Sequence, residues 1–374
     1  MTSQFWGATE TAGPTPMDVM RVWDRQPRFL RPHNRTRPPP FQASQTLVPI
    51  PAPTLLGPSH MGTIAAFWRE HYGGTDWVLD ASVSWVRTQL SVPGTITLGV
   101  MGGEGGEGGE GLIGTVVGRP VGSSVAIGTK GRERDMYVIE GLCIHRKYRG
   151  KHLAGWLIAW IDYYVSRNGP QVMVWARETG TFDASVTHIS ANIYGYIRCE
   201  DAAKHRAAAS ITRVPWSEFL DVWDTSSPAW DRSNAVFPTS LRVASHVPLD
   251  VWRCTVSGLV IVVSDTGRRT RGGIDGSQTI WEVVWMGVWK REGALVPLTE
   301  SHPQSRPVLE AIAANISEDS GLLFATDAAH QGGIHRSWAP EWHVGTSGYH
   351  MTYLYNYMPP CFWKCRYMLP RIDI

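Results

Sequence analysis

The chain has 374 residues, of which 43% are hydrophobic, and this is enough to bury two packed units. Its 35 Lys and Arg residues nearly balance 33 Asp and Glu residues, and the formal net charge of +2 excludes a strongly basic nucleic-acid-binding surface. No apolar run approaches the ~20 residues of a membrane-spanning helix and no signal-peptide pattern begins the chain, so we expect a cytoplasmic protein without an integral membrane segment.

The first part of the chain predicts an arm followed by two helices. Residues 1–60 are rich in Pro, Thr, Arg and Gln and indicate an extended N-terminal arm, of which the aromatic stretch around Trp23 docks on the body. Apolar residues recur at helical spacing from Met61 to Tyr72, where a Gly-Gly pair ends the helix. A second helix is expected from Ala81 to Leu90.

Two paired strands are predicted next, from Thr95 to Val100 and from Leu112 to Val117. The glycine-rich insert between them, residues 102–111, is interpreted as a flexible hairpin tip. It lacks the GxxxxGK[ST] pattern and the strand-to-helix context of a phosphate-binding loop, which argues against that function.

The chemically richest stretch has the order strand, basic turn, helix. Residues 136–144 indicate a strand interrupted at Glu140 and Gly141, the turn from Arg146 to Lys151 is basic, and a long apolar helix is expected from Leu153 to Val165. A buried strand follows at 172–176.

The second half predicts strands and one helix, so both halves are expected to mix α and β structure. The candidate strands lie at Leu259–Val263, Trp281–Trp285, Leu322–Thr326 and Thr352–Tyr357. The candidate helix lies at Pro307–Ile316.

The basic turn carries a phosphate-binding pattern. Backbone N–H groups are unpaired at a helix start and favour a pyrophosphate, to which Arg149, Lys151 and His152 add donors. Gly150 allows the backbone to approach closely. The alternative interpretation is an ordinary solvated basic turn.

The segment from Glu140 to Ala154 resembles the acetyl-CoA motif of GNAT-type acyltransferases and, more closely, the LCVH-type strand end and basic turn of protein N-myristoyltransferases. Two further stretches resemble that family in the same order: Trp23 to Pro27 is similar to its FWDTQP arm, and Tyr353 to Tyr357 to its YLYNW strand. The resemblance therefore spans nearly the whole chain, and it implies that the protein is a divergent member of the family.

This resemblance implies an α+β fold of two fused GNAT-like halves that form a saddle-shaped mixed sheet with flanking helices. The N-terminal half, 61–200, would bind acyl-CoA, and the C-terminal half, 201–374, would bind the peptide. The implied enzyme transfers a myristoyl group from myristoyl-CoA, its co-substrate, to the N-terminal glycine amine of a protein. A monomer with no tightly bound cofactor is expected.

The resemblance also implies the site residues. The backbone N–H groups of Gly141 and Leu142 would form the oxyanion hole, and the terminal carboxylate of Ile374 would be the base. Peptide binding would use Tyr194, Tyr355 and Asn356. Acyl-CoA binding would use Trp23, Arg149, Gly150, Lys151, His152, Leu153 and Ala154.

Two of these assignments have plainer alternatives. Last residues of a chain are usually frayed, but the apolar residues between 361 and 370 favour a docked tail that brings Ile374 to the site. Cys143 lies beside the oxyanion residues, yet a buried small side chain is a better interpretation than a nucleophile.

Five cysteines, at positions 143, 199, 254, 361 and 365, are odd in number and scattered, which favours a reducing compartment over a disulfide framework. Cys361 and Cys365 form a CxxxC pair without the second half of a zinc pattern, so no metal is expected. Two other functions stay open: a GNAT enzyme that transfers a short acyl group to an amine, and a relative that binds acyl-CoA or peptide without catalysis.

Overall fold

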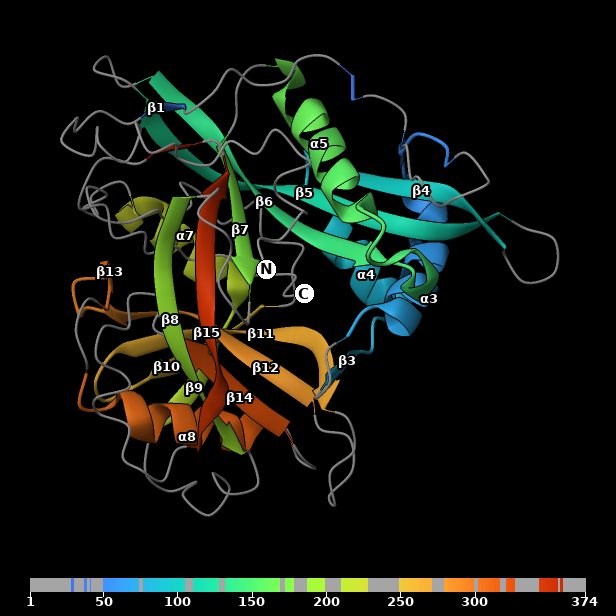
Figure 1. Ribbon diagram of the computed structural model, residues 1–374. Coiled ribbons are helices and arrows are strands. Elements are labelled where there is room, and N and C mark those ends of the chain that lie inside the picture. Colours follow the sequence, from blue (N-terminus) through green and yellow to red (C-terminus); the bar gives the residue numbers. More distant parts are fainter. Residues whose placement is uncertain are drawn as a thin grey trace.

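The structure is a computed structural model (Figure 1). It describes residues 28–29, 37–38, 41, 50–73, 77–104, 110–127, 132–168, 172–177, 187–198, 210–227, 249–270, 279–298, 302–316, 321–326, 343–355 and 357–358. Within these ranges no helix is long and apolar enough to cross a membrane.

Helices and strands are found in both halves of the described chain. The α-helices are α3 (Met61–His71), α4 (Val83–Leu90), α5 (Leu153–Val165), α7 (Trp216–Ser226) and α8 (Ser305–Ile316). The strands are β1 (Arg28–Phe29), β2 (Thr54–Leu55), β3 (Trp77–Leu79), β4 (Ile96–Glu104), β5 (Glu110–Ile127), β6 (Arg132–Ile144), β7 (Val172–Arg177), β8 (Thr187–Arg198), β9 (Ile211–Val214), β10 (Leu249–Cys254), β11 (Leu259–Thr270), β12 (Thr279–Trp289), β13 (Leu295–Pro297), β14 (Gly321–Thr326), β15 (His343–Tyr355) and β16 (Tyr357–Met358). Short 3₁₀ turns are η2 (Pro58–His60), η4 (Arg146–Tyr148) and η5 (Ser166–Asn168).

One mixed sheet passes through both halves, in the order β2-β4-β5-β6-β7-β15-β8-β14-β12-β11-β10-β9. In the N-terminal half, β4, β5 and β6 are antiparallel, α5 follows, and β7 returns parallel to β6. In the C-terminal half, β10, β11 and β12 are antiparallel, α8 follows, and β14 returns parallel to β12. The same unit is therefore present twice, as predicted.

The two halves exchange their last strands. β8 follows β7 along the chain but pairs with β14 of the other half, and β15 follows β14 but pairs with β7. β8 and β15 also pair with each other at the centre of the sheet, where Figure 1 shows them running steeply across the direction of β4 to β6. Neither half can leave the other without breaking these strand pairs.

A second connection between the halves is β3, which lies between α3 and α4 in the chain but pairs with β11. Asp80 after β3 forms an ion pair with Arg269 of β11 at 2.6 Å. Gly267 lies so close to Trp85 of α4 that a Cβ atom there would stand 2.7 Å from the indole. The interface between the halves is thus closely packed at β11.

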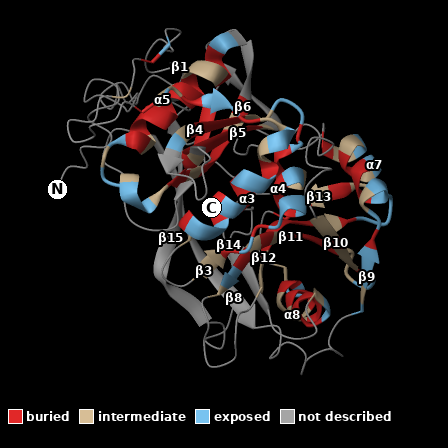
Figure 2. Ribbon diagram, turned by 90° about the vertical axis from the view of Figure 1, so that its right-hand side faces the viewer, coloured by how far each residue is buried: buried red, intermediate tan, exposed pale blue. Residues whose placement is uncertain are grey.

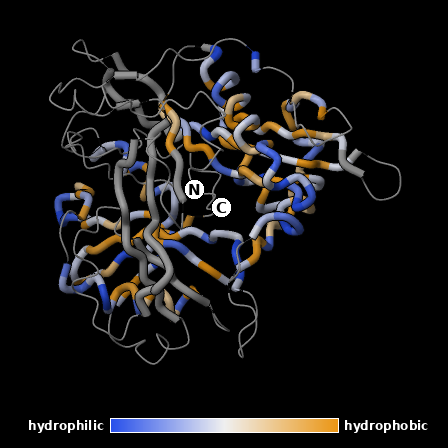
Figure 3. Tube along the Cα trace, viewed as in Figure 1, coloured by the Kyte–Doolittle hydropathy of each residue, from blue (hydrophilic) through white to orange (hydrophobic). Residues whose placement is uncertain are grey.

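Helices cover both faces of the sheet in each half. In the N-terminal half, α5 packs on one face of β4 to β6, and α3 and α4 pack on the other. In the C-terminal half, α8 and α7 cover the two faces. Figure 2 shows the buried sides of these helices against the sheet, and Figure 3 shows that hydrophobic stretches follow the strands of both halves.

Three expectations need adjustment. β6 is continuous through Gly141, because a bulge rather than a break accommodates the glycine. The glycine-rich insert is partly ordered, since residues 102–104 extend β4 and 110–111 begin β5. Residues 50–60, assigned to the arm, lie on the N-terminal half, where β2 pairs with β4. The boundaries proposed near 60 and 200 stay predictions.

Candidate functional site

β6 and β7 run together only briefly. They pair in parallel from Met136 with Val172 to Ile139 with Trp175, after which β6 continues to Ile144 with β5 alone. No strand in the described part of the chain pairs with the other edge of β6 beyond Ile139. Backbone amides along this edge are therefore available to a ligand that enters between the strands.

A β-bulge lies at this edge. Thr115 of β5 pairs with Cys143 and Val117 pairs with Glu140, so Gly141 and Leu142 together stand opposite the single residue between them. Gly141 has φ 61°, a left-handed conformation, and a Cβ atom there would stand 2.7 Å from Val117 Cγ2. Only glycine fits this position without displacing its neighbours.

Hydrogen bonds fix the peptide group that follows Gly141. The carbonyl oxygen of Gly141 accepts from Thr115 Oγ1 at 2.9 Å, and Thr115 Oγ1 accepts from Trp68 Nε1 at 2.9 Å. Because a trans peptide points its C=O and N–H in opposite directions, the N–H of Leu142 is directed away from the Thr115 hydroxyl. The sequence marks Gly141 and Leu142, but it assigns no role to Trp68 or Thr115.

The residue before the bulge is also fixed. Glu140 forms an ion pair with Arg119 of β5 at 2.6 Å, and the two side chains are only 5% and 3% exposed. A buried charge is tolerated when it is paired at this distance. The pair holds β5 and β6 together at the start of the bulge.

The basic turn follows directly after β6. His145 follows the strand as the N-cap of η4, and Gly150 and His152 both adopt left-handed conformations, with φ 74° and 63°, before α5 begins. The N-cap His152 makes no side-chain cap hydrogen bond, and the first turn of α5 has no acidic residue. The N–H groups at the start of α5 thus remain for an anionic ligand.

Arg149 is mainly a structural tether. Its Nε donates to the carbonyl of Ile144 at 3.1 Å, and its Nη2 donates to the carbonyl of His71 at the end of α3. The guanidinium therefore holds the turn against β6 and α3. A contact between Arg149 and acyl-CoA stays a prediction.

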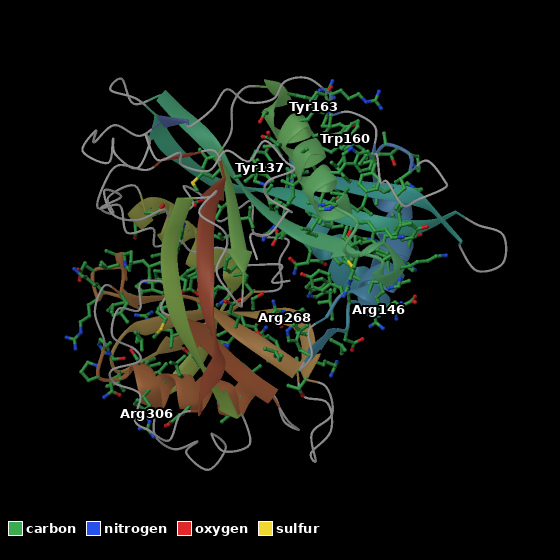
Figure 4. The ribbon with its side chains drawn as sticks, viewed as in Figure 1. Tyr137, Arg146, Trp160, Tyr163, Arg268 and Arg306 are labelled. Atoms are coloured by element: carbon green, nitrogen blue, oxygen red, sulfur yellow. The ribbon has the colours of Figure 1, made fainter. Side chains whose placement is uncertain are left out.

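Three basic side chains of the turn, those of Arg146, Lys147 and Arg149, are exposed. Lys151 lies half-buried with its Nζ 5.4 Å from the centre of the Tyr148 ring. Figure 4 shows Arg146 beside α3, at the end of α5 away from Tyr163. The sequence marks Arg146 and Lys147 only as members of a basic turn.

Two imidazoles lie beneath this turn. The rings of His71 and His145 have their centroids 4.2 Å apart, and His71 is 6% exposed. Burial, and next the neighbouring His145, lower the pKa of His71, while Glu70 opposes them. A neutral His71 is thus favoured under the turn.

The environment of Cys143 disfavours a nucleophilic role. Burial raises the pKa of its thiol to about 12, so the reactive thiolate is absent near neutral pH. Its side chain packs among the residues of α3 and α4. The plainer interpretation of Cys143 as a core residue fits this environment.

The structure describes four of the remaining predicted site residues, which lie in different parts of the fold. Leu153 is buried in the core and Ala154 is half-buried, both at the start of α5. Tyr355 pairs with Met173 of β7, whereas Tyr194 pairs with Thr326 of β14. Leu354 pairs with Thr187 on β8, seven residues from Tyr194, so the two tyrosines lie roughly 23 Å apart along the strand. Trp23, Asn356 and Ile374 lie outside the described residues.

In the C-terminal half, an additional strand lies along the corresponding edge of β12. β12 pairs with β14 only from Thr279 to Glu282, and a bulge follows at Val284. β11 pairs with one edge of β12 along its length. The other edge pairs first with β14 and then, from Gly287 to Trp289, with β13. A tight hairpin at 290–294 replaces the basic turn. β13 begins to pair only at Gly287, so it lies beyond the bulge at Val284, whereas no described strand pairs with this edge of β6 anywhere beyond Ile139.

No group of three or more His, Cys, Asp or Glu side chains is placed to hold a metal ion within the described ranges. Cys361 and Cys365 lie outside them.

No protein-family model matches the sequence, and no curated protein matches it. Two solved structures of Saccharomyces cerevisiae N-myristoyltransferase with bound myristoyl-CoA each superpose on 96% of this chain, covering 93% and 90% of theirs, with 11% identity and TM-scores of 0.63 and 0.65. A third, with bound myristoyl-CoA and inhibitors, covers 91% of this chain and 90% of its own, with 12% identity and a TM-score of 0.57. The chain therefore has the N-myristoyltransferase fold, and the predicted class of two fused GNAT-like halves is confirmed.

Proposed function

We propose that this protein is an acyl-CoA-dependent N-acyltransferase, and that it transfers a myristoyl group from myristoyl-CoA to the N-terminal glycine amine of a peptide. One observation carries the proposal: the bulge at Gly141 and Leu142 lies where β6 parts from β7 and a few residues before a cationic turn. A thioester between the strands and a pyrophosphate at the turn would use both features at once.

The N-terminal half is the proposed acyl-CoA half because no described strand pairs with β6 beyond Ile139 on the edge that β7 leaves. In the C-terminal half, β13 pairs with the same edge of β12 from Gly287 to Trp289, and Trp285 and Trp223 fill the core there. The solved structures with the same fold contain myristoyl-CoA, which supports a ligand of this class.

The proposed chemistry needs no side-chain nucleophile. The neutral glycine amine attacks the thioester carbon, a C–N bond forms, and the carbonyl electron pair moves to oxygen. Backbone N–H groups of Gly141 and Leu142 stabilise this oxyanion. Collapse of the intermediate breaks the C–S bond and releases the thiolate of coenzyme A.

The proton of the amine goes to a carboxylate base, for which we propose the terminal carboxylate of Ile374. Before the attack, this base removes one proton from the ammonium form of the glycine, whose pKa of about 8 means that the proton is only weakly held near neutral pH. Burial would raise the pKa of a terminal carboxylate from its ordinary ~3.5 and make it a better base. The attack leaves the nitrogen with one further proton to lose, and this second proton passes to the departing thiolate.

A long acyl chain would contribute most of the binding free energy. A dozen methylenes at ~0.8 kcal/mol each amount to about 10 kcal/mol before entropic costs. Selectivity for a tetradecanoyl chain is therefore a question of how long an apolar slot the protein provides.

The test is an assay with a glycine-initiated octapeptide and acyl-CoAs from acetyl to palmitoyl, read by mass spectrometry. We expect one tetradecanoyl group on the peptide amine, and no product from the same peptide with an acetylated N-terminus. Preferential transfer of acetyl would identify a short-chain acyltransferase instead. Tight acyl-CoA binding without any product would identify a non-catalytic binding protein.

A further inference from the structure

Three elements meet at the Gly141 carbonyl. Trp68 comes from α3, Thr115 from β5 and Gly141 from β6, and both of the first two side chains are fully buried. The two hydrogen bonds that join them measure 2.9 Å each. We call Trp68 and Thr115 the bulge relay.

The chemistry of the donors fixes the direction of the relay. An indole nitrogen can only donate, so Trp68 Nε1 occupies a lone pair of the Thr115 hydroxyl. The single proton of that hydroxyl is then directed to the Gly141 carbonyl. Without Trp68, the hydroxyl could rotate to other acceptors.

The relay affects the Leu142 N–H in two ways. By holding the Gly141 carbonyl, it fixes the plane of the peptide and hence the direction of the N–H. Donation to a carbonyl also polarises the peptide group, and such cooperativity strengthens the next hydrogen bond by about 10–30%. Both effects favour a bound oxyanion at Leu142.

Core packing alone does not explain the Trp68 hydrogen bond. The indole N–H groups of Trp85 and Trp160 are buried without a hydrogen-bond partner among the described residues. This protein therefore buries tryptophan without satisfying its N–H. The indole of Trp68 also covers Gly141, since a Cβ atom there would stand 3.0 Å from Trp68 Cζ2.

We propose that Trp68 and Thr115 are positioning residues for the oxyanion site, holding the Gly141–Leu142 peptide with its N–H toward the thioester oxygen. This inference rests on the proposed acyl transfer and adds to it two residues that touch neither substrate. A small shift of a pre-organised donor is costly, because catalysis depends on donors aimed at the oxyanion before it forms.

The test compares Thr115→Val, which keeps the β-branched shape, with Thr115→Ser, which keeps the hydroxyl. We expect Thr115→Val to lower kcat by about ten- to a hundredfold, with KM and Kd for acyl-CoA within about twofold of wild type. Thr115→Ser should recover most of kcat. Trp68→Phe, which removes only the indole N–H and part of the ring, should lower kcat by a smaller factor.

A matched control is Thr266→Val in the C-terminal half. Thr266 is 3% exposed, and its Oγ1 donates to the carbonyl of Ile280 on the neighbouring strand at 2.6 Å. The substitution removes the same kind of buried hydrogen bond but lies on β11. We expect kcat to stay within about twofold of wild type. An equal fall of kcat in both Thr→Val variants would mean that the loss comes from lower stability and not from the oxyanion site, and it would overturn the inference.

A crystal structure of Thr115→Val gives a readout that does not depend on turnover. We expect the Gly141 carbonyl to turn away from residue 115 and the Leu142 N–H to change direction. An unchanged peptide, or a wild-type kcat in Thr115→Val, overturns the inference. A wild-type protein that transfers no acyl group refutes the proposed function instead, and the peptide orientation then still decides whether the relay holds the bulge.

Discussion

At the scale of single residues, the site depends on one glycine that no other residue can replace. Gly141 combines a left-handed backbone with contacts to Val117 and Trp68, both of which are fully buried. The sequence signals this position by resemblance, but it does not indicate the bulge. The sequence gives only a weak signal for Thr115, which is a lone hydroxyl inside an apolar strand. It gives no signal for Trp68, because this residue lies on the apolar face of a helix.

We predict that Gly141→Ala lowers the free energy of unfolding by about 1–3 kcal/mol, from backbone strain and overpacking, and reduces turnover. Urea denaturation measures the first effect and the octapeptide assay the second. Gly62→Ala in α3 is the control, since a Cβ atom there meets nothing within 4 Å. Alanine should stabilise that helix by roughly 0.5–1 kcal/mol. Equal responses at the two positions would contradict a special role of Gly141.

The buried His71 predicts a pH dependence of stability. Its pKa is lowered from the ordinary value of 6.5, so the unfolded chain takes up the proton more readily than the folded one. The stability contributed by burying neutral His71 is complete above 6.5 and falls as the pH drops toward the lowered folded pKa. We expect His71→Phe, which keeps an aromatic ring, to flatten this fall. Urea denaturation between about pH 8 and about pH 5 measures it, and parallel curves for the two proteins would refute the assignment.

At the scale of elements, the turn between β6 and α5 carries three exposed basic side chains, those of Arg146, Lys147 and Arg149. Arg149 donates hydrogen bonds to backbone carbonyls of β6 and α3 and so holds the turn to both, and we propose the other two as phosphate ligands. The turn at 290–294, which follows the related strand β12, offers Lys290 and Arg291 in a hairpin with no helix behind it.

We predict that Arg146→Gln and Lys147→Gln each weaken acyl-CoA binding by about two- to fivefold, because an exposed charge interaction contributes up to ~1 kcal/mol. The loss should shrink at high salt, and stability should be unchanged. Isothermal titration calorimetry with acyl-CoA is the measurement. Lys290→Gln and Arg291→Gln are matched controls with no expected effect, so a comparable loss in them would place the phosphates elsewhere.

The same scale shows what the sequence could predict. α3 follows from apolar periodicity and α5 from a long apolar run, and the strand, turn and helix order around Gly141 follows from local pattern. β8, β10 and α7 were not predicted, although all three lie in the core of the fold. The exchange of β8 and β15 depends on pairing between distant segments, which periodicity does not contain. For the same reason the roles of Thr115 and Trp68 could not be predicted.

At the scale of the whole molecule, the proposed function assigns different tasks to two similar halves. Both contain a parallel strand pair that ends before a bulge, but among the described strands only those of the C-terminal half include an additional strand, β13, farther along the same edge. We therefore expect acyl-CoA to bind in the N-terminal half. Monomeric state and cytoplasmic location stay predictions.

The proposed base predicts an effect of chain length. Extending the chain by a few residues beyond Ile374 would displace the terminal carboxylate, so we expect turnover to be lost while acyl-CoA binding is retained. Single-turnover kinetics and calorimetry on the extended protein measure the two properties. Unchanged turnover would reject the carboxylate mechanism without touching the oxyanion site.

The central claim is that a thioester oxygen lies at the bulge of β6. The most direct measurement is a crystal structure with a non-hydrolysable tetradecanoyl-CoA analogue in which a methylene group replaces the sulfur next to the carbonyl. We expect the carbonyl oxygen to lie about 3 Å from the backbone nitrogen of Leu142 and the pyrophosphate to lie at the start of α5. An analogue bound in the C-terminal half, or with its carbonyl turned away from Gly141 and Leu142, would contradict it.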